Sequence, residues 1–212
     1  MIKAVSFDLD GTLVTKDYID YFWLELLPSL YSKAHGIGLD RGKREVLMMY
    51  DEVGEEDLRW YLPRYWLRKL GLGVELEDLL EDLKRLVRPY DDALRIVKLL
   101  RGSYRLVILT NAAWEFVRVV LESIPLFGES FDLALSCVTH FALTRKTAGF
   151  YRAALKVLGL RPEELLHVGD DPHYDKEVPK SLGIRALYLS REGGGDISRL
   201  TELVNYLRLQ KL

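Results

Sequence analysis

The sequence has little cysteine and few side-chain amides. Cys137 is the only cysteine in 212 residues, so an internal disulfide is excluded. We expect a reducing compartment, with this thiol serving as a small buried hydrophobe. Asn111, Asn205 and Gln210 are the only amides beside 29% charged residues. Because amides are thermolabile and charged residues support ion-pair networks, this balance predicts a thermophilic source.

Signals for membranes and nucleic acids are also missing. Hydrophobic residues make up 49% of the chain, but they fall in short periodic segments that are too short to cross a bilayer. The first predicted strand starts at Lys3, so we expect no secretory signal peptide and a cytoplasmic protein. A net charge of -2 gives no reason to expect nucleic acid. The sequence does not determine the oligomeric state.

Short apolar runs, each followed by turn or polar residues, predict five strands. They are Lys3–Phe7, Arg105–Leu109, Leu133–Ser136, Leu165–Val168 and Ala186–Leu189. Segments with helical spacing lie between the later four strands, at Trp114–Ser123, Phe150–Leu158 and Asp175–Leu182. Alternating strands and helices are typical of an α/β protein with a doubly wound parallel sheet.

One long segment breaks this alternation. Residues 16–88 show no strand pattern and instead predict four amphipathic helices, Tyr18–Ala34, Lys43–Val53, Asp57–Leu70 and Leu76–Val87. We therefore expect residues 16–88 to form an inserted helical domain, and residues 1–15 with 89–212 to form the sheet domain. The insertion is rich in aromatic residues, which we expect to pack its own core; the alternative is a face that binds an organic group.

The first predicted strand ends in two carboxylates, Asp8 and Asp10, followed by Gly11. Where the strand ends and the chain turns, both carboxyl groups can reach one small polar volume, so a cation must offset their repulsion or one acid becomes neutral. This pattern suits a nucleophile or metal ligand beside a proton donor. The alternative is a hairpin turn at Asp10-Gly11. A calcium loop is excluded because Thr12 and Leu13 stand where that motif needs an oxygen ligand and a glycine.

Polar residues also follow the other predicted strands. Ligands of open α/β sheets bind beyond the carboxyl ends of the strands, so these residues are expected to meet in space. They are Thr110 and Asn111, then Arg145 and Lys146 at longer range, then Asp170, Asp171 and Asp175. Each group has an ordinary explanation as a helix cap, a solvated charge or a turn. Together they predict one site of acids, a hydroxyl and a cation.

These motifs resemble those of the haloacid dehalogenase-like hydrolase superfamily. Asp8-Leu9-Asp10-Gly11-Thr12 is similar to its DxDGT motif, Leu109-Thr110-Asn111 to its second motif, and Gly169-Asp170-Asp171 with Asp175 to its fourth. The insertion resembles the C1-type cap of phosphatases related to phosphoglycolate phosphatase. The third motif departs from the usual Lys-Pro, because this chain has Arg145-Lys146-Thr147. Spacing from Gly169 favours Arg145 for that position, whereas the compact ammonium favours Lys146.

The resemblance implies a Rossmann-like core with a helical cap and a Mg²⁺-dependent phosphomonoester hydrolase that acts on a small phosphorylated metabolite. It implies that Asp8 is the nucleophile that becomes an aspartyl-phosphate and that Asp10 is the general acid and base. Thr110, Asn111, Lys146 and Arg145 are implied to bind the phosphoryl group. Mg²⁺ is implied to bind Asp8, the backbone carbonyl of Asp10, and Asp170. Asp175 is counted with the metal-site residues and is expected to orient either Lys146 or a metal-bound water. Asp171 is expected to be a turn residue, with a second metal contact as the alternative.

Other functions within the superfamily stay open. A dehalogenase is disfavoured, since the resemblance implies that dehalogenases lack an acid at the position of Asp10. A phosphosugar mutase would share every motif, and a catalytically silent binding or regulatory member is a further alternative. The substrate is not predicted; Lys16, His35, Lys43, Arg64 and Arg68 are the candidates on the insertion to contact it. His140, His167 and His173 lack metal-ligand spacing, so we expect them to be structural or exposed.

Overall fold

The computed structural model describes residues 1–208 and is built on one parallel sheet. Its strands are β1 (Ala4–Phe7), β2 (Arg105–Thr110), β3 (Leu133–Ser136), β4 (Leu165–Gly169) and β5 (Arg185–Tyr188). They pair in the order β3-β2-β1-β4-β5, and each neighbouring pair is parallel. The doubly wound sheet is confirmed, and each predicted strand is present with its ends shifted by no more than one residue.

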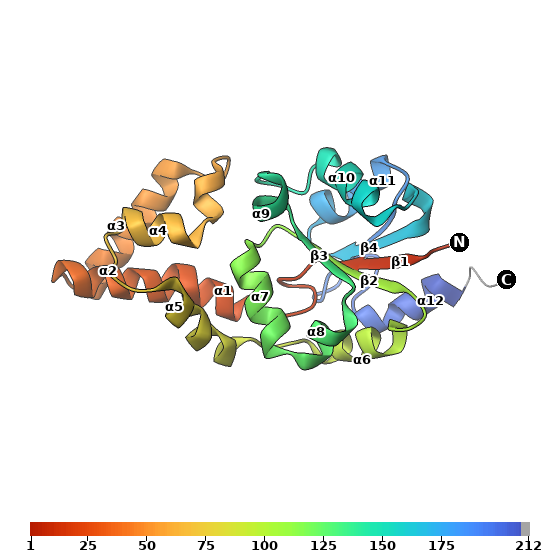
Figure 1. Ribbon diagram of the computed structural model, residues 1–212, viewed down its shortest axis with the longest axis horizontal. Coiled ribbons are helices and arrows are strands. Elements are labelled where there is room, and N and C mark those ends of the chain that lie inside the picture. Colours follow the sequence, from red (N-terminus) through yellow and green to blue (C-terminus); the bar gives the residue numbers. More distant parts are fainter. Residues whose placement is uncertain (209–212) are drawn as a thin grey trace.

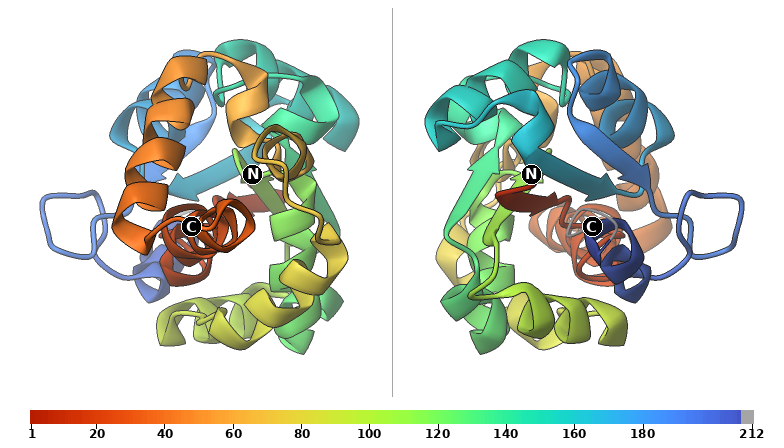
Figure 2. Two further views of the ribbon diagram at one scale, coloured as in Figure 1. Left: turned by 90° about the vertical axis from the view of Figure 1, so that its left-hand side faces the viewer. Right: turned by 90° about the vertical axis from the view of Figure 1, so that its right-hand side faces the viewer.

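Helices cover both faces of this sheet (Figures 1 and 2). One face carries α6 (Asp91–Leu100), α7 (Trp114–Ser123), α8 (Pro125–Ser130) and α12 (Leu203–Arg208); the other carries α10 (Ala148–Leu158) and α11 (Val178–Ser181). α9 (Cys137–Phe141) follows β3 directly, and short 3-10 turns cover Pro162–Glu164 and Leu200–Glu202. α8 and α9 were not predicted, because helices of six and five residues are too short to show a 3.6-residue period.

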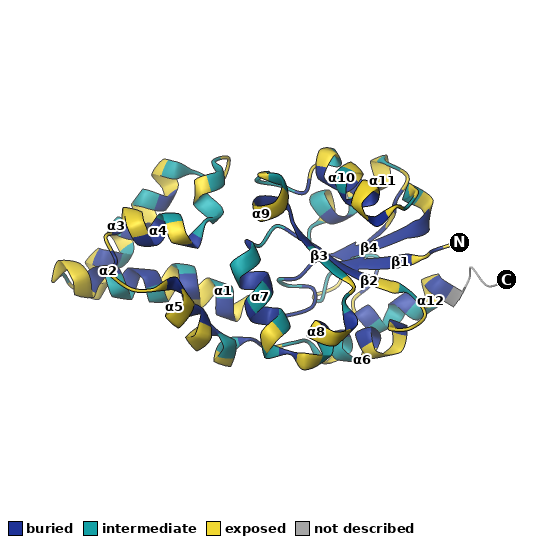
Figure 3. Cartoon of the chain, in the orientation of Figure 1, coloured by how far each residue is buried: buried dark blue, intermediate teal, exposed yellow. Residues whose placement is uncertain are grey.

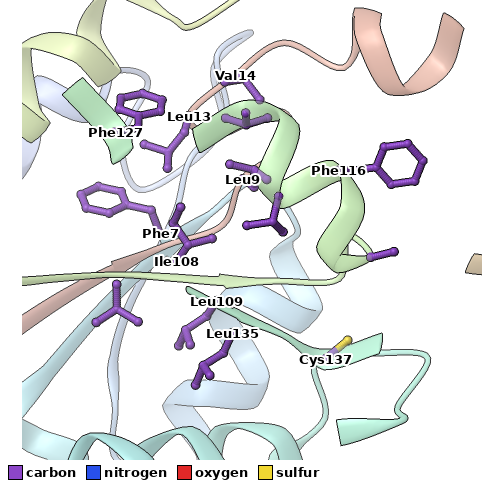
Figure 4. Close-up of a cluster of buried hydrophobic side chains, with 14 of the residues drawn as sticks. Phe7, Leu9, Leu13, Val14, Ile108, Leu109, Phe116, Phe127, Leu135 and Cys137 are labelled. Atoms are coloured by element: carbon purple, nitrogen blue, oxygen red, sulfur yellow. The ribbon is translucent and has the colours of Figure 1, made fainter. Parts of the chain in front are cut away.

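The central strands are buried on both faces, which explains their continuous apolar sequences (Figure 3). Leu9, Leu13 and Phe127 pack in the cluster around Phe7, on the face that α7 and α8 cover (Figure 4). Cys137 is fully buried, as expected of a hydrophobe, and burial raises the pKa of its thiol to about 12. No helix within residues 1–208 is long and apolar enough to cross a membrane.

Residues between β1 and α6 form helices and no strand of the sheet, as predicted. α1 (Asp17–Tyr21), a π-helical segment (Phe22–Leu26) and α2 (Leu27–His35) run on as one rod, followed by α3 (Leu39–Val53). A 3-10 turn (Leu58–Tyr61) and α4 (Pro63–Lys69) come next, then α5 (Leu76–Leu83) with a 3-10 turn (Lys84–Leu86). In Figure 1 these elements lie together at one end of the molecule.

Two predicted boundaries in the insertion were wrong. The helix expected over Asp57–Leu70 is interrupted at Leu62, which is extended because Pro63 disfavours the helical conformation in the residue before it. The helix expected from Lys43 instead starts at Leu39 and includes Gly42. A glycine is needed there because a Cβ would lie 1.9 Å from Oγ of Ser32 on α2.

The aromatic residues of the insertion pack against one another and against α7. Trp66 is fully buried, and its ring centroid lies 4.5 Å from that of Tyr50. Phe22 of the long rod packs on Phe116 of α7 at 5.1 Å. The prediction of a packed aromatic core therefore matches the structure, and the same aromatic cluster also joins the insertion to the sheet domain.

The two chain connections of the insertion lie side by side. Val14 forms an antiparallel bridge with Pro89, the Thr15 N–H donates to the Arg88 carbonyl at 2.9 Å, and the Tyr90 N–H donates to the Leu13 carbonyl at 3.1 Å. This paired geometry fits the predicted limits of 16 and 88, and the division into two domains stays a prediction.

Candidate active site

A cavity of about 490 Å³ opens at the carboxyl ends of β1, β2 and β4. Every residue predicted for the site lines it, namely Asp8, Asp10, Thr110, Asn111, Arg145, Lys146, Asp170, Asp171 and Asp175. Lys16, Glu55, Ala112 and Tyr174 complete the lining. The parallel sheet thus brings together residues that are up to 167 positions apart in the chain, as expected for strands that all end at one edge.

Lys146 lies between two buried carboxylates. Its Nζ is 2.5 Å from Oδ1 of Asp8 and 2.5 Å from Oδ1 of Asp175. Burial alone would lower the pKa of Lys146, but the charges of Asp175 and Asp8 outweigh burial and hold it well above its ordinary value. Burial raises the pKa of Asp8, although Lys146 opposes the shift. Lys146 is therefore a permanent positive charge in contact with the first carboxylate of the DxDGT-like motif.

Asp175 is held by several donors at once. Besides Lys146, its carboxylate accepts hydrogen bonds from the Asp171 N–H at 3.1 Å and the Tyr151 hydroxyl at 3.4 Å, and it pairs with His167 Nε2 at 3.0 Å. Burial favours the neutral form, but Lys146 and His167 hold the pKa of Asp175 below its ordinary value. This arrangement orients Lys146, one of the two roles expected of Asp175.

Gly169 makes room for that carboxylate. A Cβ on Gly169 would lie 2.3 Å from Asp175 Oδ2, so a side chain there would displace the carboxylate. His167 is fully buried on β4, and its Nδ1 lies 2.8 Å from Ser6 Oγ on β1. It is structural, as expected, and its contact with Asp175 could be found only from the tertiary structure. His173, by contrast, lies in an exposed pair with Glu177.

Asp10 has a different partner, the Tyr18 hydroxyl of α1, which donates to its Oδ1 at 2.7 Å. Burial raises the pKa of Asp10 to about 6, although this hydrogen bond lowers it. A carboxyl group with such a pKa can carry a proton near neutral pH and then release it. Tyr18 was missed as a site residue because it follows the apolar pattern of its helix, and nothing local indicates that its hydroxyl faces Asp10.

Asp170 lies at the rim of the same group of acids. Its Oδ1 accepts from the Thr12 hydroxyl at 3.3 Å, and its Oδ2 is 2.8 Å from Lys16 Nζ. Carboxylate oxygens of Asp8, Asp170 and Asp175 all lie within 4.8 Å of one another, which is close enough for them to hold a metal ion. Asp171 is a turn residue, as predicted, because its side chain accepts the backbone N–H groups of His173 and Tyr174.

The second motif supplies Thr110 and Asn111 at the end of β2. The Thr110 hydroxyl accepts from the Ala112 N–H at 3.2 Å. The Asn111 amide donates to the Thr144 carbonyl at 2.7 Å and accepts from the Cys137 thiol. The Asn111 side chain thus fixes the loop that leads to Arg145 and Lys146.

The structure separates the two candidates for the third motif. Arg145 pairs with Glu55 of the insertion, and its guanidinium lies 5.7 Å from the Tyr61 ring and 6.0 Å from the Tyr174 ring. Lys146 is the cation that contacts Asp8. In place of the usual proline, Thr147 precedes α10, and its N–H donates to the Arg145 carbonyl at 2.8 Å. The geometry therefore favours Lys146, contrary to the spacing from Gly169.

Comparison with known proteins places these motifs in a family. The model of the haloacid dehalogenase-like hydrolases matches residues 2–183. The GMP/IMP nucleotidase YrfG of Escherichia coli (strain K12) is 27% identical over 185 residues, covering 87% of this chain and 81% of that protein.

Solved structures agree with this match. A HAD phosphatase from Thermococcus onnurineus has a TM-score of 0.83 and 26% identity, covering 97% of this chain and 98% of that chain. A 2-haloacid dehalogenase from Pseudomonas syringae pv. Tomato DC3000 shares the fold, with a TM-score of 0.69 and 19% identity over 99% of this chain and 100% of that chain. With the family model matching most of its length, this chain belongs to the haloacid dehalogenase-like hydrolases.

Proposed function

We propose that this hydrolase is a Mg²⁺-dependent phosphomonoesterase that works through an aspartyl-phosphate on Asp8. The observation that carries the proposal is the pair of carboxylates at the end of β1, since Asp8 contacts Lys146 whereas Asp10 contacts the Tyr18 hydroxyl. Two acids in one cavity with different partners can take different roles. An acid at position 10 also favours phosphate esters over haloacids, because a halide leaves without a proton.

The residues divide the reaction between them. Asp8 attacks phosphorus and displaces the alkoxide, while Asp10 gives a proton to that alkoxide and then accepts one from the water that hydrolyses the intermediate. Lys146 neutralises charge between the Asp8 carboxylate and an incoming phosphoryl oxygen, and Asp175 holds Lys146 in place. Thr110 and Asn111 line the same cavity, and we assign the Thr110 hydroxyl and the Asn111 backbone N–H to the remaining oxygens.

The carboxylate oxygens at the cavity wall fit Mg²⁺. Mg²⁺ prefers oxygen ligands, and Asp8 and Asp170 offer carboxylate oxygens close together at the cavity wall. We propose these two side chains and the Asp10 carbonyl as the protein ligands. Asp175 is a weaker candidate, because both of its oxygens already accept protein donors. When bound, the ion would neutralise charge so that the phosphate dianion can approach Asp8.

The similarity to the nucleotidase YrfG suggests which substrates to test first. We propose nucleoside monophosphates as the first class to test, because a relative that is 27% identical over 185 residues is a GMP/IMP nucleotidase. The relative also favours hydrolysis over the phosphosugar mutase and silent-binder alternatives. We propose residues 16–88 as a cap, since Lys16 and Glu55 of this segment line the cavity.

The test is a phosphate-release assay with purified protein. We expect Mg²⁺-dependent hydrolysis of at least one ester from a panel containing GMP, IMP, sugar phosphates, phosphoglycolate and p-nitrophenyl phosphate. EDTA should abolish it, and Asp8→Asn should lower turnover by orders of magnitude. Full activity of Asp8→Asn on the best substrate would remove Asp8 from its role, and interconversion of sugar phosphates without phosphate release would identify a mutase.

A further inference from the structure

Lys16 lies beside the four acids of the cavity, Asp8, Asp10, Asp170 and Asp175, which we call the acidic cluster. The proposed reaction gives Lys16 no role. It is the first residue of the proposed cap, and its Nζ is 2.8 Å from Oδ2 of Asp170. Its side chain is 53% exposed and that of Asp170 is 25% exposed, so the pair is at the cavity rim. The contact joins residues 154 positions apart and links the connection of the insertion to β4.

The backbone is shaped to allow this pair. Gly11 has a φ of +85° and passes directly beside it, and a Cβ there would lie 2.3 Å from Asp170 Oδ2 and 2.6 Å from Lys16 Cε. Both the conformation and the space therefore require glycine. The lysine stem and the carboxylate fill the volume that any other side chain would occupy, so the pair has a defined place in the packing.

Charge balance explains why a cation is needed there. Asp8, Asp10, Asp170 and Asp175 all line the cavity, whereas Lys146 is already shared between Asp8 and Asp175. Lys16 pairs with one oxygen of Asp170, and the other oxygen accepts from the neutral Thr12 hydroxyl. Without it, Asp170 would add uncompensated negative charge to the cluster.

We propose that Lys16 is a resident counter-cation of Asp170 that Mg²⁺ displaces when it binds. The inference rests on the proposed function, in which Asp170 is a metal ligand. The Lys16 ammonium lies 2.8 Å from Oδ2 of Asp170, where it takes up part of the carboxylate and would repel a cation bound beside it, so Mg²⁺ and Lys16 compete for Asp170. The half-exposed stem leaves the ammonium free to turn into the cavity, which it already lines.

Calorimetric titration with Mg²⁺ tests the competition without using activity. Lys16→Met keeps the length of the stem and removes the charge, so its Kd for Mg²⁺ should fall by about fivefold relative to the unmodified protein, the size of one partly exposed ion pair. Lys43→Met is the matched control. Lys43 pairs with Glu25 at 2.5 Å within the insertion and does not line the cavity, so this variant should leave the Kd unchanged.

Lysine acetylation followed by mass spectrometry tests the displacement itself. Lys16 should react faster in Mg²⁺ than in EDTA, while Lys43 should react equally in both.

Equal Mg²⁺ affinities for Lys16→Met and the unmodified protein, or weaker binding by the variant, would overturn the inference even if hydrolysis is intact. If the unmodified protein hydrolyses esters fully in EDTA and binds no Mg²⁺, both this inference and the metal-dependent function are wrong.

Discussion

Asp8 and Asp10 stand two residues apart in the chain, yet their carboxyl groups meet different surroundings. Burial raises the pKa of Asp8, and the Lys146 ammonium in contact with it opposes that shift by favouring the ionised carboxylate. Asp10 contacts the Tyr18 hydroxyl, and burial raises its pKa to about 6. Burial raises the pKa of both carboxyl groups, while the Lys146 ammonium and the Tyr18 hydroxyl give the two acids different partners.

Removing the acid at position 10 should separate substrates by their leaving groups. Asp10→Asn should slow hydrolysis of alkyl phosphates such as nucleoside monophosphates by about 10²- to 10⁴-fold, the range for a general acid. p-Nitrophenyl phosphate should suffer far less, because its leaving group departs without a proton. Turnover of both substrates by the same preparation checks this, and equal losses on the two would contradict the role of Asp10.

Substitutions of Lys146 and Arg145, the two cations of the third motif, should have very different effects on catalysis. Lys146→Ala removes the charge beside Asp8, so kcat should fall by about 10²- to 10³-fold, as for the loss of one preorganised transition-state donor. Arg145→Ala removes a contact with Glu55 at the cavity mouth and serves as the matched control, with a smaller effect mainly on KM. Steady-state kinetics of both variants checks this, and the reverse order would transfer the role to Arg145.

At the scale of elements, α2 and α3 approach closely through a glycine. Gly42→Ala would place a methyl group 1.9 Å from Ser32 Oγ, so the helices must separate or Ser32 must change rotamer. We expect a loss of stability of about 1–3 kcal/mol, as for overpacking of a closely packed contact. Chemical denaturation measures it, and the double variant with Ser32→Gly should recover part of the loss.

A second glycine gives the control for this prediction. Gly73 has no atom within 4 Å of an added Cβ, so Gly73→Ala should change stability by less than about 1 kcal/mol. If Gly42→Ala is as stable as Gly73→Ala, the contact between α2 and α3 is looser than the structure shows. The predicted start of α3 was four residues late because Gly42 weakens the local helix signal, although the contact with Ser32 leaves no room for a side chain at that position.

At the scale of the whole molecule, the insertion contacts the rest of the chain on two sides of the cavity. On one side its helices pack on α7 through Phe22 and Phe116, with ion pairs such as Lys84–Glu122 at 2.9 Å. On the other side, in the part of the chain that the structure describes, Glu55 pairs with Arg145. The paired connections at Val14 and Pro89 join the insertion to the rest of the chain, and we predict that they act as the hinge of a cap.

A phosphate mimic should change the position of the insertion if it is a lid. We expect Mg²⁺ with beryllofluoride, which mimics a phosphoryl group on Asp8, to reduce the radius of gyration in solution scattering as the cap closes to exclude water. Asp8→Asn is the matched control, since it cannot form the mimic and should give one scattering profile under both conditions. If an active preparation of the unmodified protein gives the same scattering profile with and without the mimic, the insertion is not a lid.

Local patterns were enough to predict the parallel sheet, the helical insertion and the residues that gather at the site. Alternating apolar runs are local signals, and parallel strands must end at one edge, so Asp8, Thr110 and Asp170 had to meet there. The predicted ends of helices were wrong where contacts with a neighbouring element override the local helix preference, as at Gly42.

The contacts between individual side chains at the site depend on how the elements pack. It paired Lys146 and not Arg145 with Asp8, and it brought the Tyr18 hydroxyl to Asp10 and Lys16 to Asp170. These choices depend on the packing of α1 and the loop before α10 against the sheet. Lys146 and Asp8 are 138 positions apart, Lys16 and Asp170 are 154 apart, and Tyr18 lies on α1 whereas Asp10 follows β1. Periodicity predicts the face of an element on which a side chain lies, but not the group that it meets once the elements have packed.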